Sequence, residues 1–438
     1  MSLQFITGNS GNGKTKYLFN RIVKEAKANP RDNYLVIVPE QFTMQTQRQL
    51  VDLSENKAIM NIDVLSFKRL AYRVFDELGI TNLTVLEETG KNLVLRKLAA
   101  QEADKLGVIG RNLNRIGYIS EVKSLLSELV QYNISPEELG RYIASGRLSD
   151  TLSDKLKDVL VLYEAFEKFM QDKYITAEEI LNVLCNVAEE SAILRNSVIA
   201  FDEFTGFTPI QNQLIKKLFV ISKKIYVTLT IDCREDIFKS RGMQELFDMP
   251  KRTVKSLTEM AAFYGIEVEE PIILDKNYRL AENEELSFME QQLFRKRRRS
   301  FEKAPKHIHI DCLRDPKQEL TKIARRINEL VRNENLRYRD IAIVTGDVNI
   351  YAGYVREIFD KYNIPYFIDA TQEILFHPFI EFIRSIPDIA AQNFSADAVF
   401  RFLRCGFTEL TDSEIDVLEN YAVSYTHLRA HETLANLV

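Results

Sequence analysis

Eight residues near the N-terminus carry the most specific chemistry in the chain. They match the phosphate-binding pattern G-x-x-x-x-G-K-[ST] and are Gly8, Asn9, Ser10, Gly11, Asn12, Gly13, Lys14 and Thr15. The glycines let backbone N–H groups approach phosphate oxygens, and a following helix adds partial positive charge. We expect Lys14 to reach the β- and γ-phosphates and Thr15 to place its hydroxyl on Mg²⁺. These residues, called the phosphate loop below, are predicted to bind a nucleoside triphosphate.

Two carboxylates later in the chain complete the expected site. Asp202 and Glu203 end the apolar run at residues 197–201. A strand that ends in two carboxylates is typical of proteins with a phosphate loop, although alone it can be an exposed strand end. We expect Asp202 to hold the Mg²⁺ shell and Glu203 to act as the base that orients an attacking water.

The elements that must position these residues follow a β-α pattern. The phosphate loop lies between an apolar run at 4–7 and a helical stretch at 15–28, and the runs at 34–39 and 62–67 also precede helical stretches. The pattern resumes with strands at 197–203 and 224–232. A parallel, right-handed α/β sheet is therefore predicted.

Two further regions have different patterns. Residues 87–190 read as helices only, with a small core and with charged faces that either contact DNA or are simply solvated. Strands at 307–310, 340–344 and 366–369 alternate with helices at 316–331 and 351–362, which predicts a second α/β domain.

Composition narrows the class of protein. The 438 residues carry a net charge of −5, and the four cysteines form no C-x-x-C pair. The chain shows no basic-then-apolar leader and no run of about 20 apolar residues, so we expect a cytoplasmic protein without membrane contact.

The cations at 295–299 suit either contact with a nucleic-acid phosphate backbone or a solvated linker between domains. His307 and His309 lack ligand partners, so no metal site is expected there.

These stretches resemble superfamily 1 helicases and, more closely, the AddB (RexB) subunits of AddAB-type ATP-dependent helicase/deoxyribonucleases. The resemblance reaches about residue 422 and rests on the phosphate loop and on residues 38–41, 64–67, 70–71, 201–204, 206–209, 274, 277–279 and 340–344. It implies a P-loop NTPase fold with RecA-like domains. The implied domains are a first RecA-like domain at 1–86 and 191–272, a helical insertion at 87–190, the start of a second RecA-like domain at 273–370, and a further helical segment at 371–422.

The resemblance also implies a function and partners. Proteins of this kind pair with an A-type motor and nuclease subunit, bind ATP, Mg²⁺ and double- and single-stranded DNA, resect double-strand breaks for homologous recombination, and recognise Chi. By the match to the N-Y-R segment, Arg279 is a candidate for contact with the γ-phosphate from the second α/β domain. The nuclease Mg²⁺ and the iron-sulfur cluster of the family belong to a C-terminal part that is expected to be missing here.

Departures from the family pattern point to a degenerate motor. Superfamily 1 motors read D-E-x-Q-D where this chain has Asp202 and Glu203 followed by Phe204-Thr205-Gly206. The glutamine expected after the strand at 224–232 is absent as well. An ATP-binding DNA scaffold without hydrolysis is therefore one alternative, and an unrelated P-loop NTPase is another. The long interval between Thr15 and Asp202 argues against a small-molecule kinase.

The last residues break the pattern. The stretch at 424–433 continues nothing before it and is typical of translated sequencing-adapter read-through. We therefore expect residues 423–438 to be a non-native tail.

Overall fold

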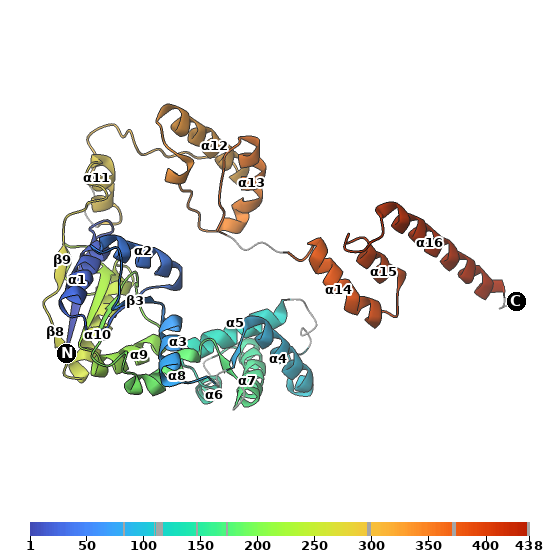
Figure 1. The fold of residues 1–438 in the computed structure, drawn as a ribbon, viewed down its shortest axis with the longest axis horizontal. Helices are drawn as coiled ribbons and strands as arrows, with labels where there is room; N and C mark the ends of the chain where they lie inside the picture. The colour runs from blue at the N-terminus through green and yellow to red at the C-terminus, as the bar shows by residue number, and fades with distance from the viewer. Residues whose placement is uncertain are drawn as a thin grey trace. The chain divides into compact units, whose positions relative to one another are not determined.

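The computed structural model of the chain consists of two compact units, Met1–Ile308 and His309–Val438. It describes residues 1–81, 84–108, 110, 117–145, 148–171, 174–295, 299–369 and 374–435, with side chains up to residue 424. Each unit is described by itself below, and Figure 1 labels the elements.

A seven-stranded parallel sheet forms the centre of the first unit, which confirms the predicted α/β class. The order is β3-β2-β6-β7-β1-β8, with β9 also paired to β1. The strands are β1 (Ser2–Gly8), β2 (Tyr34–Ile37), β3 (Ile62–Leu65), β6 (Val198–Phe201), β7 (Lys224–Thr230), β8 (Glu267–Val268) and β9 (Ile272–Leu274). Five of them lie where apolar runs predicted strands, because strands buried on both faces are apolar throughout.

Helices cover both faces of this sheet (Figure 1). One face carries α1 (Lys14–Ala28) and α2 (Thr43–Leu53), and the other carries α3 (Phe67–Leu78), α8 (Ile180–Val187), α9 (Pro209–Ile221) and α10 (Asp248–Phe263). Successive side chains of a strand alternate between the two layers, so Phe5 packs with the second set and Ile6 with the first. The result places the carboxyl ends of β1 and β6 at one edge, where the phosphate loop begins.

The helical region has a core of its own between Leu95 and Met170. It is built from α4 (Glu88–Gln101), α5 (Tyr118–Gln131), α6 (Pro136–Ala144) and α7 (Asp150–Met170), beside the short pair β4 (Val85–Leu86) and β5 (Ile175–Thr176). The Ser135 side chain caps α6, as its sequence predicts. Helix α8 does not join this core, because Ile180 and Leu184 pack against the sheet.

The second unit differs from the expected α/β domain. Helices α12 (Pro316–Asn333) and α13 (Val348–Lys361) form where predicted, but the strands expected at 307–310, 340–344 and 366–369 are wrong. A strand needs a neighbouring edge to satisfy its backbone, and the described residues of this unit include no other strand. Ile310 and Val344 are consequently more than nine-tenths exposed.

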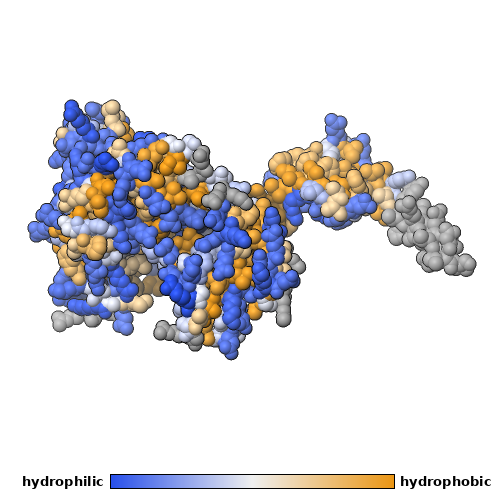
Figure 2. Space-filling view, turned by 90° about the horizontal axis from the view of Figure 1, so that it is seen from below, coloured by the Kyte–Doolittle hydropathy of each residue, from blue (hydrophilic) through white to orange (hydrophobic). Residues whose placement is uncertain are grey.

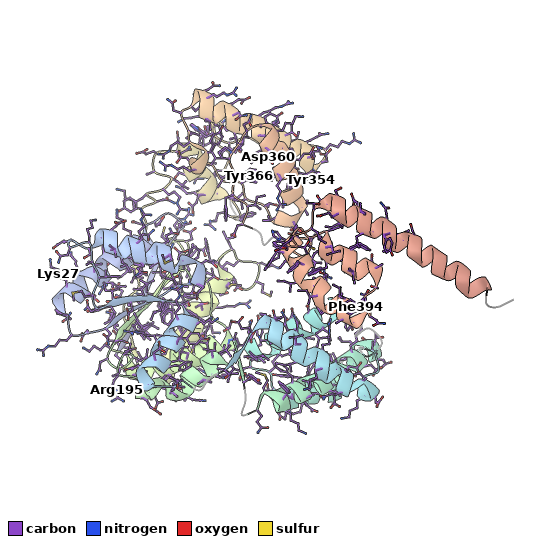
Figure 3. The ribbon with its side chains drawn as sticks, turned by 45° about the vertical axis from the view of Figure 1, so that its right-hand side comes forward. Lys27, Arg195, Tyr354, Asp360, Tyr366 and Phe394 are labelled. Atoms are coloured by element: carbon purple, nitrogen blue, oxygen red, sulfur yellow. The ribbon has the colours of Figure 1, made fainter. Side chains whose placement is uncertain are left out.

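Aromatic packing replaces one of the missing strands. Tyr366 lies beside α13, where its ring centroid is 5.8 Å from that of Phe359. Figure 3 shows Tyr366 together with Tyr354 and Asp360 of that helix. Tyr366 is thus held by side-chain packing and not by strand pairing, whereas Phe367 is 89% exposed.

The other α-helices in the described part of the second unit are α14 (Pro378–Ala391), α15 (Ala396–Leu403) and α16 (Asp412–Ala435). Helix α16 continues past residue 423, where the non-native tail is expected to begin. Phe382 and Phe402 stack with ring centroids 4.7 Å apart and join α14 to α15. Apolar side chains remain exposed on these helices (Figure 2), among them Ile383 and Ile386. None of the described helices combines the length and apolar character needed to cross a membrane.

Candidate nucleotide-binding site

The phosphate loop connects β1 directly to α1. Gly8 ends the strand, and Gly13 precedes the helix in the left-handed region with φ 78°. Gly11 has φ 89°, which also favours glycine. The N-terminus of α1 is therefore turned toward the carboxyl edge of the sheet, where its partial positive charge favours an anion.

Lys14 lies against the loop that it follows. Its Nζ donates to the carbonyl oxygens of Gly8 at 3.1 Å and Asn9 at 3.0 Å. Burial lowers the pKa of Lys14, although the charges of Glu203 and Asp202 act in the opposite direction. The ammonium group is thus placed between the loop and the two predicted acidic residues.

Asp202 follows β6 and is 1% exposed. The Thr228 hydroxyl donates to one of its carboxylate oxygens, whereas Oδ2 is buried without a hydrogen-bond partner among the described residues. Burial raises the pKa of Asp202, against the effect of the Thr228 hydrogen bond. A buried carboxylate oxygen without a donor fits a cation ligand.

Glu203 lies between Asp202 and the phosphate loop. Its Oε1 accepts a hydrogen bond from Thr15 Oγ1 at 3.3 Å, and its backbone has φ 64°, which is uncommon for a residue other than glycine. The structure therefore brings Thr15, Asp202 and Glu203 together, although Thr15 and Asp202 lie 187 positions apart in the sequence.

The segment after β9 packs directly on the phosphate loop. The Tyr278 backbone N–H donates to the Gly11 carbonyl at 3.0 Å, and Asn277 Nδ2 donates to the Ser10 carbonyl at 3.0 Å. A Cβ on Gly11 would lie 2.8 Å from Asn277 Oδ1, so only glycine permits this approach.

Arg279 reaches the loop from the first unit, which corrects the expectation that it comes from a second α/β domain. Its Nη1 donates to Ser10 Oγ at 3.4 Å. The reason is topological, because β9 pairs with β1 and ends at Leu274, next to the loop. Asn12 Nδ2 adds a hydrogen bond of 2.5 Å to the Leu274 carbonyl.

These residues surround one cleft, which we call the nucleotide cleft. It has a volume of about 840 Å³. Its lining consists of the loop residues Ser10, Gly11, Gly13, Lys14 and Thr15, of Lys16, Phe19, Phe42, Gln45, Thr46, Gln49, Asp52 and Leu53, and of Asp202, Glu203, Phe204, Thr205, Thr228, Thr230, Tyr278 and Arg279. Tyr278 is 65% exposed there, and the Lys276 ammonium lies 4.9 Å from the centroid of its ring.

A metal ion in this cleft would need ligands from outside the protein. Within the described part of the chain, no three His, Cys, Asp or Glu side chains are close enough together to hold one. Mg²⁺ normally keeps several waters and takes phosphate oxygens beside one or two carboxylates. Asp202 and Thr15 line the same cleft, which suits that kind of shared coordination.

Two residues at or near the cleft could not be identified from sequence patterns. Thr228 supports Asp202 from the neighbouring strand β7, and its only signal was a hydroxyl within an apolar run. Asp232, after the same strand, accepts two hydrogen bonds from the Arg234 guanidinium and forms an ion pair with Arg295 at 2.5 Å. The Arg295 charge is thus paired within the protein. Residues 296–298 of the cationic run lie outside the described residues.

Comparison with known proteins identifies the family of the chain. The family described as ADDB, N-terminal matches residues 5–290. The B subunit of the ATP-dependent helicase/deoxyribonuclease of Lachnoclostridium phytofermentans is 39% identical over 430 residues, which cover 97% of this chain and 37% of that protein. The proteins of the same name from Clostridium tetani and Caldanaerobacter subterraneus are 33% and 34% identical, with 97% of this chain covered.

The chain therefore spans a little over a third of the length of these relatives. The family match includes the phosphate loop, both acidic residues and the Arg279 segment. On this evidence the chain belongs to the ADDB N-terminal family.

Proposed function

We propose that the nucleotide cleft binds ATP with Mg²⁺, within a P-loop NTPase domain of the RecA-like, superfamily 1 type. The observation that supports this most is the convergence of Lys14, Thr15, Asp202, Glu203 and Arg279 on one cleft. These residues come from three separate segments of the sequence, at 14–15, 202–203 and 279, and all five line the same cleft.

Each residue has a distinct role in this proposal. Lys14 binds the β- and γ-phosphates, and Arg279 lies where it can contact the γ-phosphate across Ser10. Thr15 and Asp202 hold the Mg²⁺ shell, and the unpartnered Asp202 Oδ2 fits that role. When bound, Mg²⁺ would neutralise charge on the phosphate oxygens. Glu203 orients the attacking water, because its carboxylate lies at the cleft beside Thr15.

The longer protein is proposed to be the B subunit of a heterodimeric ATP-dependent helicase and exonuclease. The relatives are named as the B subunits of such an enzyme, which supports an A-type partner, a DNA substrate and a cytoplasmic location. Resection of double-strand breaks and recognition of Chi belong to the same proposal. The nuclease Mg²⁺ and the iron-sulfur cluster are assigned to the part of the relatives that this chain does not span.

A second candidate is an ATP-binding DNA scaffold without hydrolysis. It is favoured by the turn after β7, where Asp232 is neutralised by Arg234 and Arg295 and where residues 230–234 contain no glutamine. In that case the cleft binds ATP while a partner protein drives translocation.

The experiment compares ATP affinity and turnover, with and without single-stranded DNA, in the unaltered chain and in two lysine variants. Lys14→Ala should weaken ATP binding at least about tenfold, since it removes a charge-assisted contact with phosphate. Lys27→Ala is the matched control, because Lys27 is an exposed lysine on the same helix (Figure 3) whose ammonium pairs with Glu55 at 2.6 Å, away from the cleft lining.

The outcomes separate the candidates. Turnover that DNA stimulates and Lys14→Ala abolishes would support a working ATPase. Binding without turnover would support the scaffold. Equal ATP affinity in the unaltered and Lys14→Ala chains would overturn the proposed site.

A further inference from the structure

Asn9 has a role that the phosphate-loop pattern does not require. Its side chain is 5% exposed and is bonded at both ends. The Cys233 backbone N–H donates to Oδ1 at 2.9 Å, and Nδ2 donates to Glu290 Oε1 at 2.5 Å. Glu290 belongs to α11 (Glu284–Gln292), so the loop is tied to the turn after β7 and to α11 at once.

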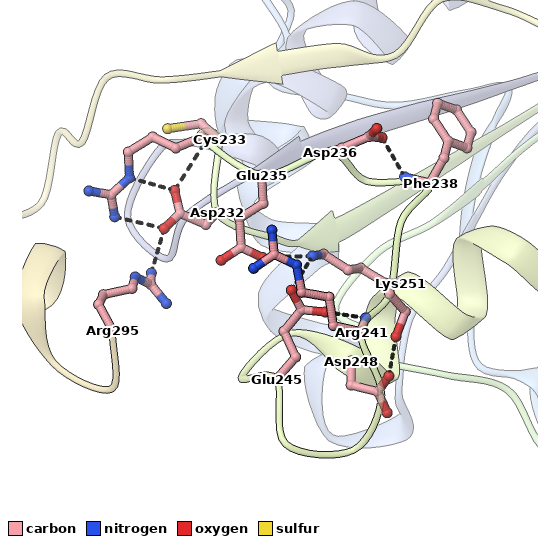
Figure 4. Close-up of polar contacts among 12 residues, drawn as sticks. Asp232, Cys233, Glu235, Asp236, Phe238, Arg241, Glu245, Asp248, Lys251 and Arg295 are labelled. Atoms are coloured by element: carbon pink, nitrogen blue, oxygen red, sulfur yellow. Dashed lines mark hydrogen bonds and ion pairs between the residues drawn. The ribbon is translucent and has the colours of Figure 1, made fainter. Parts of the chain in front are cut away.

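A second connection reaches the same turn. Asp232, next to Cys233, is 2% exposed and forms the ion pair with Arg295, three residues beyond the end of α11. Figure 4 shows the Arg295 guanidinium at this carboxylate, whose two oxygens also accept hydrogen bonds from Arg234. The Arg295 guanidinium also lies 5.3 Å from the centroid of the Phe247 ring. Asn9, Asp232, Cys233, Glu290 and Arg295 are called the α11 network below.

The α11 network is anchored and not freely adjustable. Burial disfavours the charged form of Asp232, but the hydrogen bonds and charges of Arg234 and Arg295 outweigh it, and the pKa of Asp232 is lowered. The side chain of Arg295 is only 17% exposed. Breaking either connection would leave a buried charge or amide without its partner, which is costly.

The network meets the proposed nucleotide contacts at Asn9. The Asn9 carbonyl accepts from Lys14 Nζ at 3.0 Å and from the Asn12 N–H at 3.2 Å. If the Lys14 ammonium moves to a phosphate, the Asn9 carbonyl loses its hydrogen bond from Lys14. The Asn9 side chain still donates to Glu290 of α11. The position of the loop and the position of α11 are therefore linked through Asn9.

We propose that Asn9 is a positioning residue through which ATP binding at the phosphate loop and the packing of residues 284–295 stabilise each other. The inference rests on the proposed function, because it needs a nucleotide in the cleft. Linkage is reciprocal, so an effect of ATP on α11 must equal the effect of α11 on ATP affinity.

The test measures amide hydrogen exchange in α11 with and without a non-hydrolysable ATP analogue and Mg²⁺, together with the affinity for that analogue. In the unaltered chain, the analogue should slow exchange across α11. In Asn9→Ala and Arg295→Ala, affinity should fall about three- to tenfold, at the low end of typical couplings. The protection of α11 by the analogue should also disappear.

Three further variants distinguish loss of this link from a general loss of structure. Glu290→Gln keeps an acceptor for Asn9 Nδ2 and should preserve the protection, whereas Glu290→Ala should not. Lys303→Ala removes an exposed ion pair between Lys303 and Glu284 of the same helix and should change nothing.

The results discriminate between the nucleotide site and its coupling to α11. An analogue that binds the unaltered chain but leaves α11 exchange unchanged would overturn this inference alone. Retained protection of α11 in Asn9→Ala would overturn it as well. An analogue that does not bind the unaltered chain would overturn the proposed function and the inference with it.

Discussion

At the scale of single residues, Asp202 combines burial with an unused carboxylate oxygen. Burial raises its pKa above the usual 3.8, so the folded chain disfavours the charged form that the unfolded chain adopts readily. The stabilisation present while the group is protonated is therefore lost as pH rises above 3.8 toward its raised pKa.

Replacing Asp202 with asparagine should remove this pH dependence. Relative to the unaltered chain, Asp202→Asn should gain free energy of unfolding as pH rises above 3.8 in the absence of metal. Urea denaturation in chelator at several pH values measures the difference. Parallel stability curves for the two chains would contradict the assignment of the raised pKa to Asp202.

Gly11 offers a second test at residue scale. Alanine there would adopt φ near 89° and place its Cβ 2.8 Å from both Arg279 Cβ and Asn277 Oδ1. We expect Gly11→Ala to lower the free energy of unfolding and to weaken ATP binding, because the Asn277 segment must move away from the loop.

Gly79→Ala is the matched control for Gly11→Ala. Gly79 is also left-handed, with φ 69°, but its Cβ would meet nothing within 4 Å. Gly79→Ala should lower the free energy of unfolding by about 1–2 kcal/mol, which is the cost of left-handed backbone for a residue other than glycine. It should leave the affinity for ATP unchanged. Gly11→Ala should cost about 1–3 kcal/mol more, the usual range for overpacking. Equal losses in urea denaturation would argue against close packing over the loop.

At the scale of elements, one buried ion pair joins the helical region to the segment before α8. Lys91 of α4 is 3% exposed, and its Nζ lies 2.6 Å from a carboxylate oxygen of Glu178, which is 11% exposed. Lys91→Met should destabilise the chain by about 3–5 kcal/mol, because it strands the Glu178 charge.

The double variant Lys91→Met with Glu178→Leu should recover most of that loss, since both charges are then gone. Lys157→Met, which removes an exposed pair with Asp154 on α7, is the control and should stay within about 0.5 kcal/mol. Urea denaturation measures all three variants. A double variant no more stable than Lys91→Met would show that packing, and not the stranded charge, is responsible.

At the scale of the whole molecule, the first unit contains every element of the candidate site. All seven strands of the large sheet, the nucleotide cleft and the family match at 5–290 lie within Met1–Ile308. A fragment of residues 1–308 should therefore fold cooperatively and bind ATP with the affinity of the longer chain.

Thermal unfolding followed by circular dichroism, together with ATP titration, tests this expectation. Lys14→Ala within the fragment is the control for specific binding. A fragment that aggregates, or that folds but does not bind ATP, would show that the second unit is needed.

Local sequence patterns were sufficient to predict most strands of the large sheet. The phosphate loop, the strands around it, the acidic pair and the cap of α6 all depend on residues close together in the chain, and the structure places them as predicted. The strands expected at 307–310, 340–344 and 366–369 failed because apolar residues make a strand only where another strand offers an edge.

The sequence by itself determined the chemistry of the candidate site, because glycine, lysine, hydroxyl and carboxylate groups follow from local spacing. Only the tertiary structure decided what surrounds it. Three contacts join residues more than 260 positions apart. They are the pairing of β9 with β1, the hydrogen bond from Arg279 to Ser10 and the hydrogen bond from Asn9 to Glu290. Such contacts depend on sheet topology and burial, which no local spacing encodes.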